Sequence, residues 1–366
     1  MSDPESTGEK IEFHCASCGA RLEYAPGTEN LTCQYCGTEN EIAPPATKVE
    51  EQDFTAILKQ AEEEHGLEER LTVKCAACAA ESTFEPNVTS RTCPYCGTQI
   101  VGQGQSAKLL KPKAILPFSV KRDQAFASFQ AWLNGLWFAP NALKRFVRAE
   151  GLNGIYAPYW TYDAEVEASY VGQRGEYYYV TQTYTTTVNG KSVTRTRQVR
   201  KVRWYPPVSG HVHTNFDDVL VIGSASLPTE KTEALEPWDL DHLQPYRDEY
   251  VAGFRVESYT VGLADGFRIA KDKMQPLIER NIRAAIGGDT QRILSMSPDY
   301  RNVTFKHVLL PLWLSAFKYR ERVFRFLVNA RTGEVQGERP WSWGKIALVA
   351  GGAAALIAAL IALFGR

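Results

Sequence analysis

Eight cysteines constrain this chain more than any other feature of its sequence. All eight stand in four CxxC pairs, and a shift of 60 residues without a gap superimposes the first two pairs on the last two. Fourteen residues separate the two pairs of each set, which is enough for two short strands and a turn. The sequence therefore predicts two copies of one small β module. The two sets are Cys15, Cys18, Cys33 and Cys36, and Cys75, Cys78, Cys93 and Cys96.

Four cysteines in this spacing are typical of a structural zinc site, in which tetrahedral thiolate ligation leaves no position for water. A module of about 30 residues has almost no hydrophobic core of its own, so we expect each ribbon to need its metal to fold. We therefore predict two structural Zn²⁺ ions. The N-terminal residues carry no apolar secretory segment, which favours a reducing compartment. Disulfides and redox-active dithiols are the competing interpretations.

The first ribbon has the wrong charge for nucleic acid. From residue 11 to residue 42, five acids stand against one base, Arg21, a formal charge of −4. Phosphate binding requires Lys and Arg, and the second ribbon is only balanced. The net charge of the whole chain is −1. The composition therefore favours protein contacts over nucleic-acid contacts for both ribbons.

The fold class that we expect is α+β: two tandem small β zinc ribbons, a mixed α/β domain with antiparallel hairpins, and one C-terminal transmembrane helix. The acidic stretch between the ribbons has apolar residues at spacings of three and four, which predicts a helical linker. The predicted boundaries are a disordered tail at 1–10, ribbons at 11–42 and 71–102, the linker at 43–70, the α/β domain at 105–340 and the membrane helix at 346–364.

Within the α/β domain, helical spacing of aromatic and leucine residues predicts a helix over 121–148 with one buried stripe that includes Trp137. A second helix is predicted over 268–286, with a kink or boundary at Pro276. A short echo, Pro158-x-Trp160 and Pro311-x-Trp313, precedes two strand-like runs. It suggests a domain built from two related halves.

A basic strand is predicted in the same domain. Tyr-, Thr- and Val-rich runs flank Asn189-Gly190, a dipeptide that favours a tight hairpin turn. Alternation along an unbroken strand puts five bases on one face, which could meet anionic headgroups or an acidic partner. The alternative is a solvated face paired with local acids. The five bases are Lys191, Arg195, Arg197, Lys201 and Arg203.

The C-terminal segment 346–364 has 19 uncharged residues, nine of them Leu, Ile, Val or Phe. A helix of that length spans about 28 Å, close to the hydrocarbon core of a bilayer. Trp341, Trp343 and Lys345 precede it, where interfacial anchors belong. A buried core helix is the alternative. Alanines four residues apart in the segment suggest a homo-oligomer through helix contacts, although an alanine-rich anchor without a partner fits equally.

Motifs of catalysis are absent from the sequence. Gly190-Lys191-Ser192 lacks the upstream glycine of a phosphate-binding loop and follows a hairpin, so we expect no nucleotide motor. His211-x-His213, with Asp217 and Asp218 nearby, is a weak metal motif that also suits an exposed strand end. We therefore expect a protein that is not an enzyme, although an unrecognised site in the α/β domain would overturn this expectation.

Four further motifs accompany the double ribbons: Tyr156-Ala-Pro-Tyr-Trp160-Thr-Tyr-Asp163-Ala, Lys201-Val-Arg-Trp204, Phe216-Asp-Asp-Val-Leu220 and Leu235-Glu-Pro-Trp238-Asp-Leu. With them, the chain resembles an uncharacterised bacterial family of double zinc-ribbon, C-terminally membrane-anchored proteins. Members are often named after the primosomal replication helicase (primosomal protein N′), which also carries paired cysteine knuckles. The helicase motor is missing here, so the resemblance implies no helicase activity. A more distant likeness, in architecture alone, is to zinc-ribbon membrane anchors that recruit stress-response scaffold proteins.

These observations favour a tail-anchored, non-enzymatic adaptor in the inner or plasma membrane, with one span and the bulk of the chain in the cytosol. Its ribbons and α/β domain would bind other proteins. Five aromatic residues either line that surface or form core: Tyr156, Trp160, Tyr162, Trp204 and Trp238. The alternative function is a primosome-like, nucleic-acid-binding replication factor without a motor, against which the charge of the first ribbon counts.

Overall fold

The computed structural model describes most of the chain. The described residues are 13–42, 49–62, 67–74, 81–84, 90–92, 99–101, 105–138, 151–188, 191–319, 322–338 and 342–364. The tail at 1–10 and the four cysteines of the second set lie outside them.

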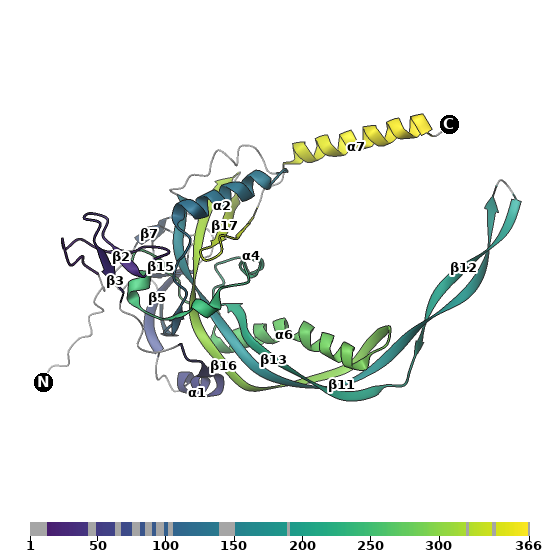
Figure 1. The fold of residues 1–366 in the computed structure, drawn as a ribbon, viewed down its shortest axis with the longest axis horizontal. Helices are drawn as coiled ribbons and strands as arrows, with labels where there is room; N and C mark the ends of the chain where they lie inside the picture. The colour runs from purple at the N-terminus through teal and green to yellow at the C-terminus, as the bar shows by residue number, and fades with distance from the viewer. Residues whose placement is uncertain are drawn as a thin grey trace.

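A ten-stranded, mostly antiparallel sheet forms the body (Figure 1). Its two longest strands, β11 (Asn153–Val188) and β16 (Thr290–Tyr319), pair with each other over most of the length of β16. The other edge of β11 pairs first with β13 (Val208–Ile222) and then, from Gly175 onward, with β12 (Lys191–Trp204). The remaining strands are β4 (Gln52–Asp53), β10 (Ala114–Ile115), β14 (Gln244–Pro245), β15 (Arg255–Val256), β17 (Arg322–Asn329) and β18 (Val335–Gly337).

The sheet is built from two similar halves. One half runs from β10 through α2 (Arg122–Gly135) to β11, and the other from β15 through α6 (Leu263–Ile286) to β16. Each short strand pairs in parallel with the long strand of the other half. The indole N–H of Trp160 donates to the carbonyl of Val261 at 2.9 Å, and that of Trp313 donates to the carbonyl of Val120 at the same distance. The echo of Pro-x-Trp in the sequence thus has a structural counterpart.

Helix α6 covers the face of the sheet to which the even-numbered residues of β11 point. Its buried residues recur every three or four positions, which puts them on one stripe against Trp160, Tyr162 and Val166. The helix runs through Pro276 without ending there. The buried stripe consists of Phe267, Ala270, Met274, Ile278, Ile282 and Ile286.

Helix α2 ends before the predicted C-terminal bound of 121–148, and residues 139–148 of that prediction lie outside the described residues. It begins after Lys121, whose backbone N–H donates to the side chain of Gln124 at 2.9 Å, and ends at Gly135. Phe129 and Leu133 are buried as predicted, but Trp137 is 74% exposed. The helical spacing fails for Trp137 because the helix ends at Gly135 and Leu136 caps it, so that the next residues no longer follow the buried stripe.

The first cysteine set lies in a small three-stranded sheet, β1 (Glu23–Tyr24), β2 (Asn30–Thr32) and β3 (Glu39–Glu41). Around the second set, the backbone forms β5 (Leu67–Lys74), β6 (Glu81–Phe84) and β9 (Gln105–Leu110) in one sheet. A separate pair is formed by β7 (Ser90–Thr92) and β8 (Gln99–Val101). Within the 43–70 segment the helix, α1 (Phe54–Glu62), is short, and β5 begins at Leu67.

Helix α7 (Trp343–Phe364) projects from the body (Figure 1). Residues 344–362 have a mean hydropathy of 2.2, and none of this stretch is buried. Length and composition make α7 a candidate membrane span, and its exposure argues against the core helix that was the alternative. Three short helical segments complete the described elements: α4 (Thr229–Glu233), α5 (Asp248–Val251) and the 3₁₀ turn Leu240–His242.

Candidate metal centre and its surroundings

The four sulfurs of the first set come together as the spacing predicts. They lie within 4.8 Å of one another, with 3.5 Å between Cys15 and Cys36 and 3.5 Å between Cys18 and Cys33. A tetrahedral site with Zn–S bonds of 2.3 Å has sulfurs about 3.8 Å apart. The donor set and its spacing therefore fit a Zn²⁺ ion, and four thiolates would fill its coordination shell.

Two matching turns build this site. The N–H of Gly19 donates to the carbonyl of Cys15 at 2.8 Å, and the N–H of Gly37 donates to that of Cys33 at 3.0 Å. Both glycines have positive φ, of 74° and 72°, which L-residues with a side chain rarely adopt. In each turn the first cysteine is buried and the second exposed: Cys15 and Cys33 inside, Cys18 and Cys36 outside. One side of the site thus faces the solvent.

The surroundings shift the thiols in opposite directions. The hydroxyl and backbone N–H of Thr38 lower the pKa of Cys36 to about 6, which favours the thiolate that a metal needs. The backbone N–H of Cys18 lowers the pKa of Cys15. The N–H of Ala20 acts the same way on Cys18, but hydrogen bonds with the sulfurs of Cys36 and Cys33 outweigh it and raise the pKa of Cys18 to about 12. Metal binding would therefore release protons.

The first ribbon is docked on the body rather than tethered to it. Leu22, Tyr24 and Leu31 belong to the same hydrophobic cluster as Phe118 and Tyr156 of the body. The Tyr24 ring packs edge-on against Tyr250, with 5.5 Å between ring centroids. Its backbone N–H donates to the carbonyl of Ala252 at 3.0 Å. The ribbon thus shares its core with the sheet, and the predicted lack of a core applies only to the isolated module.

Gly27 allows the first ribbon to approach the backbone of the body closely. Its φ is +80°, its N–H donates to the carbonyl of Phe118 at 2.8 Å, and a Cβ at this position would lie 2.9 Å from the carbonyl oxygen of Ser119. Backbone cannot yield as a flexible side chain can, so only glycine fits here.

The second cysteine set lies outside the described residues. The structure therefore supports one four-cysteine group that could bind a metal, and the second ion stays a prediction from the 60-residue repeat.

The base of α7 rests against the end of α2. Lys345 donates from its ammonium to the carbonyl of Trp137 at 3.1 Å, and the N–H of Ser342 donates to the carbonyl of Phe138 at 2.8 Å. The exposed Trp137 therefore stands where the apolar helix begins, although the sequence placed it in a buried stripe. Of the other predicted anchors, Trp341 and the side chain of Trp343 lie outside the described part of the structure.

The predicted hairpin extends away from the body. We call residues 176–188 of β11 and 191–204 of β12 the arm. Their pairing runs without a register shift from Gly175–Trp204 to Val188–Lys191. Because β12 is unbroken, all five predicted bases share one face with the even-numbered residues of β11. This face carries Lys191, Arg195, Arg197, Lys201 and Arg203 beside Glu176, Tyr178, Gln182 and Tyr184.

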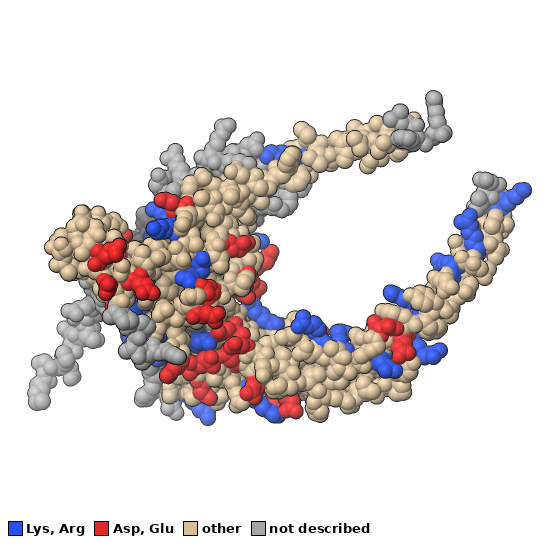
Figure 2. Space-filling view, viewed as in Figure 1, with Lys and Arg blue, Asp and Glu red and all other residues tan. Residues whose placement is uncertain are grey.

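Acids do not balance these bases. The arm sequence contains six Lys or Arg and one acid, Glu176, a formal charge of +5. Glu176 pairs with Arg174 at 3.2 Å, below the arm. Instead, guanidinium groups stack on tyrosines: Arg203 lies 5.5 Å from the ring centre of Tyr178. The face is solvent-exposed, as the alternative interpretation expects, but its one acid is Glu176, opposite Arg203. Figure 2 shows Lys and Arg along the arm with Asp and Glu gathered on the body.

Four of the five aromatic residues that were open between surface and core are core. Tyr156, Trp160 and Tyr162 are fully buried, and Trp238 is 7% exposed. Trp204 is half-buried at the base of the arm, with the guanidinium of Arg292 3.9 Å above its ring. These aromatic motifs therefore build the sheet and do not form a binding surface.

A buried lysine forms a cluster that sequence analysis missed. The Lys306 ammonium lies 2.8 Å from a carboxylate oxygen of Asp218, 3.2 Å from one of Glu51 and 3.9 Å from one of Asp163. Burial raises the pKa of Asp163 to about 6, against the backbone N–H of Asp218 and the charge of Lys306. The acids in turn outweigh the burial of Lys306 and raise its pKa.

This cluster ties the segment between the ribbons to the sheet. Asp163 and Asp218 meet at a bulge between β11 and β13, and Asp218 has a φ of 50°. Asp217 joins them within 4.8 Å. The weak His211-x-His213 metal motif is thus not assembled with these acids in the described residues. The ammonium of Lys306 already supplies the positive charge that a metal ion would bring to these carboxylates.

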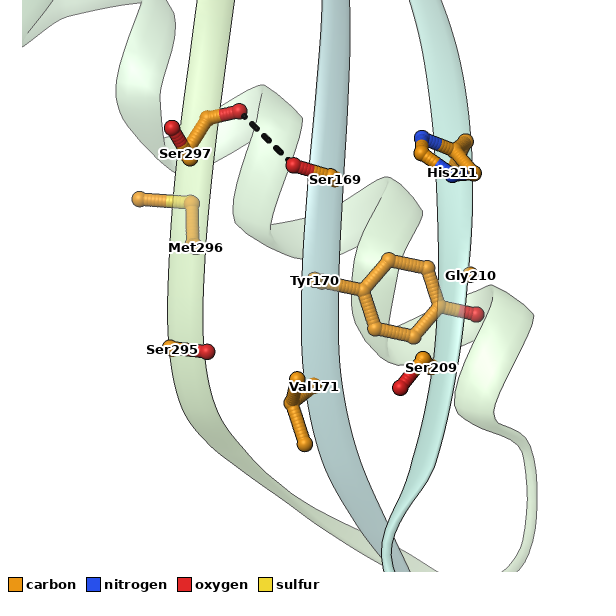
Figure 3. Close-up of a pocket in the computed structure, with 9 residues that line it drawn as sticks. All are labelled: Ser169, Tyr170, Val171, Ser209, Gly210, His211, Ser295, Met296 and Ser297. Atoms are coloured by element: carbon orange, nitrogen blue, oxygen red, sulfur yellow. Dashed lines mark hydrogen bonds between the residues drawn. The ribbon is translucent and has the colours of Figure 1, made fainter.

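A cavity of about 240 Å³ lies on the sheet face opposite the stripe of α6. Figure 3 shows Ser169, His211 and Ser297 on three neighbouring strands along its wall. The hydroxyl of Ser169 donates to the backbone carbonyl of Ser297 at 3.5 Å, not to His211. The nine residues that line the cavity include no acid. The lining thus has serines and a histidine, but it lacks the acid and the Ser–His hydrogen bond of an acyl-transfer triad among the described residues.

Comparisons with known proteins give one distant relative. The chain is similar to YdjG of Bacillus subtilis (strain 168), described as an uncharacterized protein, with 23% identity over 338 residues that cover 92% of each chain. No protein-family profile matches the chain, and no solved structure matches it. None of these comparisons supports a relation to the primosomal helicase.

Proposed function

We propose that this protein is a membrane-anchored, zinc-binding adaptor. It presents a protein-interaction surface at the cytosolic face of the inner or plasma membrane. Each ribbon holds one structural Zn²⁺ ion, and α7 crosses the membrane once. The free thiols of the first set suit a reducing cytosol, where metal rather than a disulfide joins cysteines.

One observation carries this proposal: the four-cysteine module and the apolar helix extend from opposite sides of a single body (Figure 1). The first ribbon is fixed to the sheet through shared core and backbone hydrogen bonds. An anchor on one side and a rigid, metal-stabilised module on the other are the two parts that an adaptor needs.

The exposed side of the first ribbon is its candidate contact surface. Tyr35, between Cys33 and Cys36, is 82% exposed. Large aromatic side chains are enriched in protein interfaces because they bury much area at a small entropic cost. The acids of this ribbon select a partner with basic or polar contacts and disfavour nucleic acid.

Crosslinking in the native membrane tests the proposal. A photo-reactive amino acid at Tyr35 should capture a defined protein, identified by mass spectrometry. The matched control is the same amino acid at Leu294, which is 52% exposed in β16 and should not capture it. Replacement Cys36→Ser should abolish capture, because the site loses a ligand and with it the metal that holds the turn carrying Tyr35 in shape.

Two results would contradict the adaptor. One is an identical set of captured proteins at Tyr35 and Leu294. The other is purified, reduced protein without about two zinc ions per chain by metal analysis. Salt-dependent retention of DNA by the wild-type chain would instead favour the replication-factor alternative.

A further inference from the structure

The arm contributes little to the fold. Beyond Gly175, β11 leaves both β13 and β16, and within the described strands β12 pairs with β11 alone. Tyr179 and Tyr184 are 63% and 40% exposed. A two-stranded ribbon without a packed face is marginally stable in water. An extension of about 40 Å that buries no core is therefore explained by contacts outside the chain.

The charge of the arm selects an anionic partner. It carries +5, while the chain as a whole carries −1. Five of the six bases share one face with Tyr178 and Tyr184, so that charged and amphipathic aromatic groups alternate over one surface. Arg and Lys bind phosphate oxygens, and Tyr is enriched where apolar and aqueous phases meet.

The anchor brings the arm to such a surface. Five residues separate β18, which ends at Gly337, from α7, which begins at Trp343. They span at most about 18 Å. Figure 1 shows α7 and the arm leaving the body toward the same side. A body held this close to the bilayer brings an arm of about 40 Å within reach of the lipid surface in every copy of the protein.

We propose that the arm lies along the headgroup layer of the membrane that holds α7 and binds the phosphates of anionic lipids. This proposal rests on the insertion of α7. The arm does not enter the hydrocarbon, because open strand edges and charges are excluded from it. It fixes the orientation of the body, so that the first ribbon is directed into the cytosol. An acidic protein or nucleic acid could meet the same charges, but nothing in the fold brings either of them to the arm.

Proteolysis of the full-length chain in lipid nanodiscs tests this contact. Arg200 lies on the other face of the arm and is exposed, so tryptic cleavage after it reports access to the arm. We compare discs of phosphatidylcholine with discs that also contain phosphatidylglycerol. Anionic lipid should slow cleavage after Arg200 at least about tenfold, and high salt should restore it.

Removing bases from the arm tests whether their charge causes the protection from trypsin. The variant Arg195→Gln, Arg197→Gln and Lys201→Gln keeps Arg200 and should be cleaved equally in both kinds of disc. The control Arg268→Gln, Arg280→Gln and Arg283→Gln removes the same charge from the exposed side of α6 and should keep the protection. Co-purification of the chain with the discs reports insertion of α7 separately.

Each other outcome overturns the proposal. Equal cleavage of the inserted wild-type chain in neutral and anionic discs rules out lipid binding by the arm and leaves the anchor intact. Protection only in native membranes assigns the arm to a protein, and protection by added DNA assigns it to nucleic acid. A chain that does not insert fails both this proposal and the membrane adaptor.

Discussion

The two halves of the sheet differ in how far the chain extends beyond their equivalent tryptophans. In one half, β11 continues for 28 residues after Trp160 and ends in the arm. In the other, β16 continues for six residues after Trp313 and turns into β17, which packs beside α2. Both halves keep the helix, the tryptophan and its hydrogen bond to a valine carbonyl. The sheet thus needs these shared parts, and the second half shows that a long extension is not required to build it.

Replacing the two tryptophans tests this equivalence most severely. Trp160→Ala and Trp313→Ala should each lower the free energy of unfolding by about 3–5 kcal/mol, because each empties a packed site and leaves a half-buried valine carbonyl without its donor. Chemical denaturation of the full chain in detergent measures both. Trp204→Ala, at the half-buried base of the arm, is the matched control and should cost far less. If only one of these two replacements lowered the free energy of unfolding, the two halves would not be equivalent.

The fourth residue of each helix provides a second test of how alike the two halves are. This position is Gly266 in α6 and Ala125 in α2. A Cβ on Gly266 would collide with the hydroxyl of Tyr162 and lie 3.0 Å from the Trp160 ring. Gly266→Ala should therefore cost about 1–3 kcal/mol, although alanine favours helices. Ala125→Gly should cost about 1 kcal/mol from helix propensity and a lost methyl group.

Denaturant midpoints of these two variants, measured in parallel, check the assignment. A Gly266→Ala variant that unfolds at or above the wild-type midpoint would show that the contact between α6 and β11 is looser than the geometry indicates.

Removing the arm should have the smallest effect on stability. Replacement of residues 179–200 by Asn-Gly joins Tyr178 to Lys201, which already face each other in the ladder. The free energy of unfolding should change by less than about 0.5 kcal/mol, because the deleted pairs contact no core. Thermal unfolding in detergent measures this. A large fall in the melting temperature would mean that the arm supports the sheet, as the other half's β17 does.

Local patterns in the sequence predicted the parts of the fold that depend on neighbouring residues. The CxxC spacing located the first four-cysteine group, and Asn189-Gly190 located the hairpin whose unbroken strand aligns the five bases. The uncharged run after Lys345 predicted α7. In each case the controlling interaction is a turn, an alternation or a composition that a short window contains.

Other features depend on contacts between distant residues and could not be predicted. Lys306 contacts Glu51, Asp163 and Asp218, which come from three separate segments of the chain. A bulge in β11 and the positive φ of Asp218 bring these side chains together. Trp137 kept helical spacing, yet α2 ended at Gly135, two residues before it. Docking of the first ribbon on the sheet depends on Gly27, whose role is visible only beside the backbone at Ser119.

The common core of the first ribbon and the sheet has a consequence for the life of the protein in a cell. Loss of the ion would loosen Leu22 and Tyr24 and uncover the aromatic patch of Phe118 beneath them. Quality-control proteases recognise such uncovered apolar surface. If the first site holds zinc as proposed, the abundance of this protein should therefore fall when the metal is scarce, without any dedicated sensor.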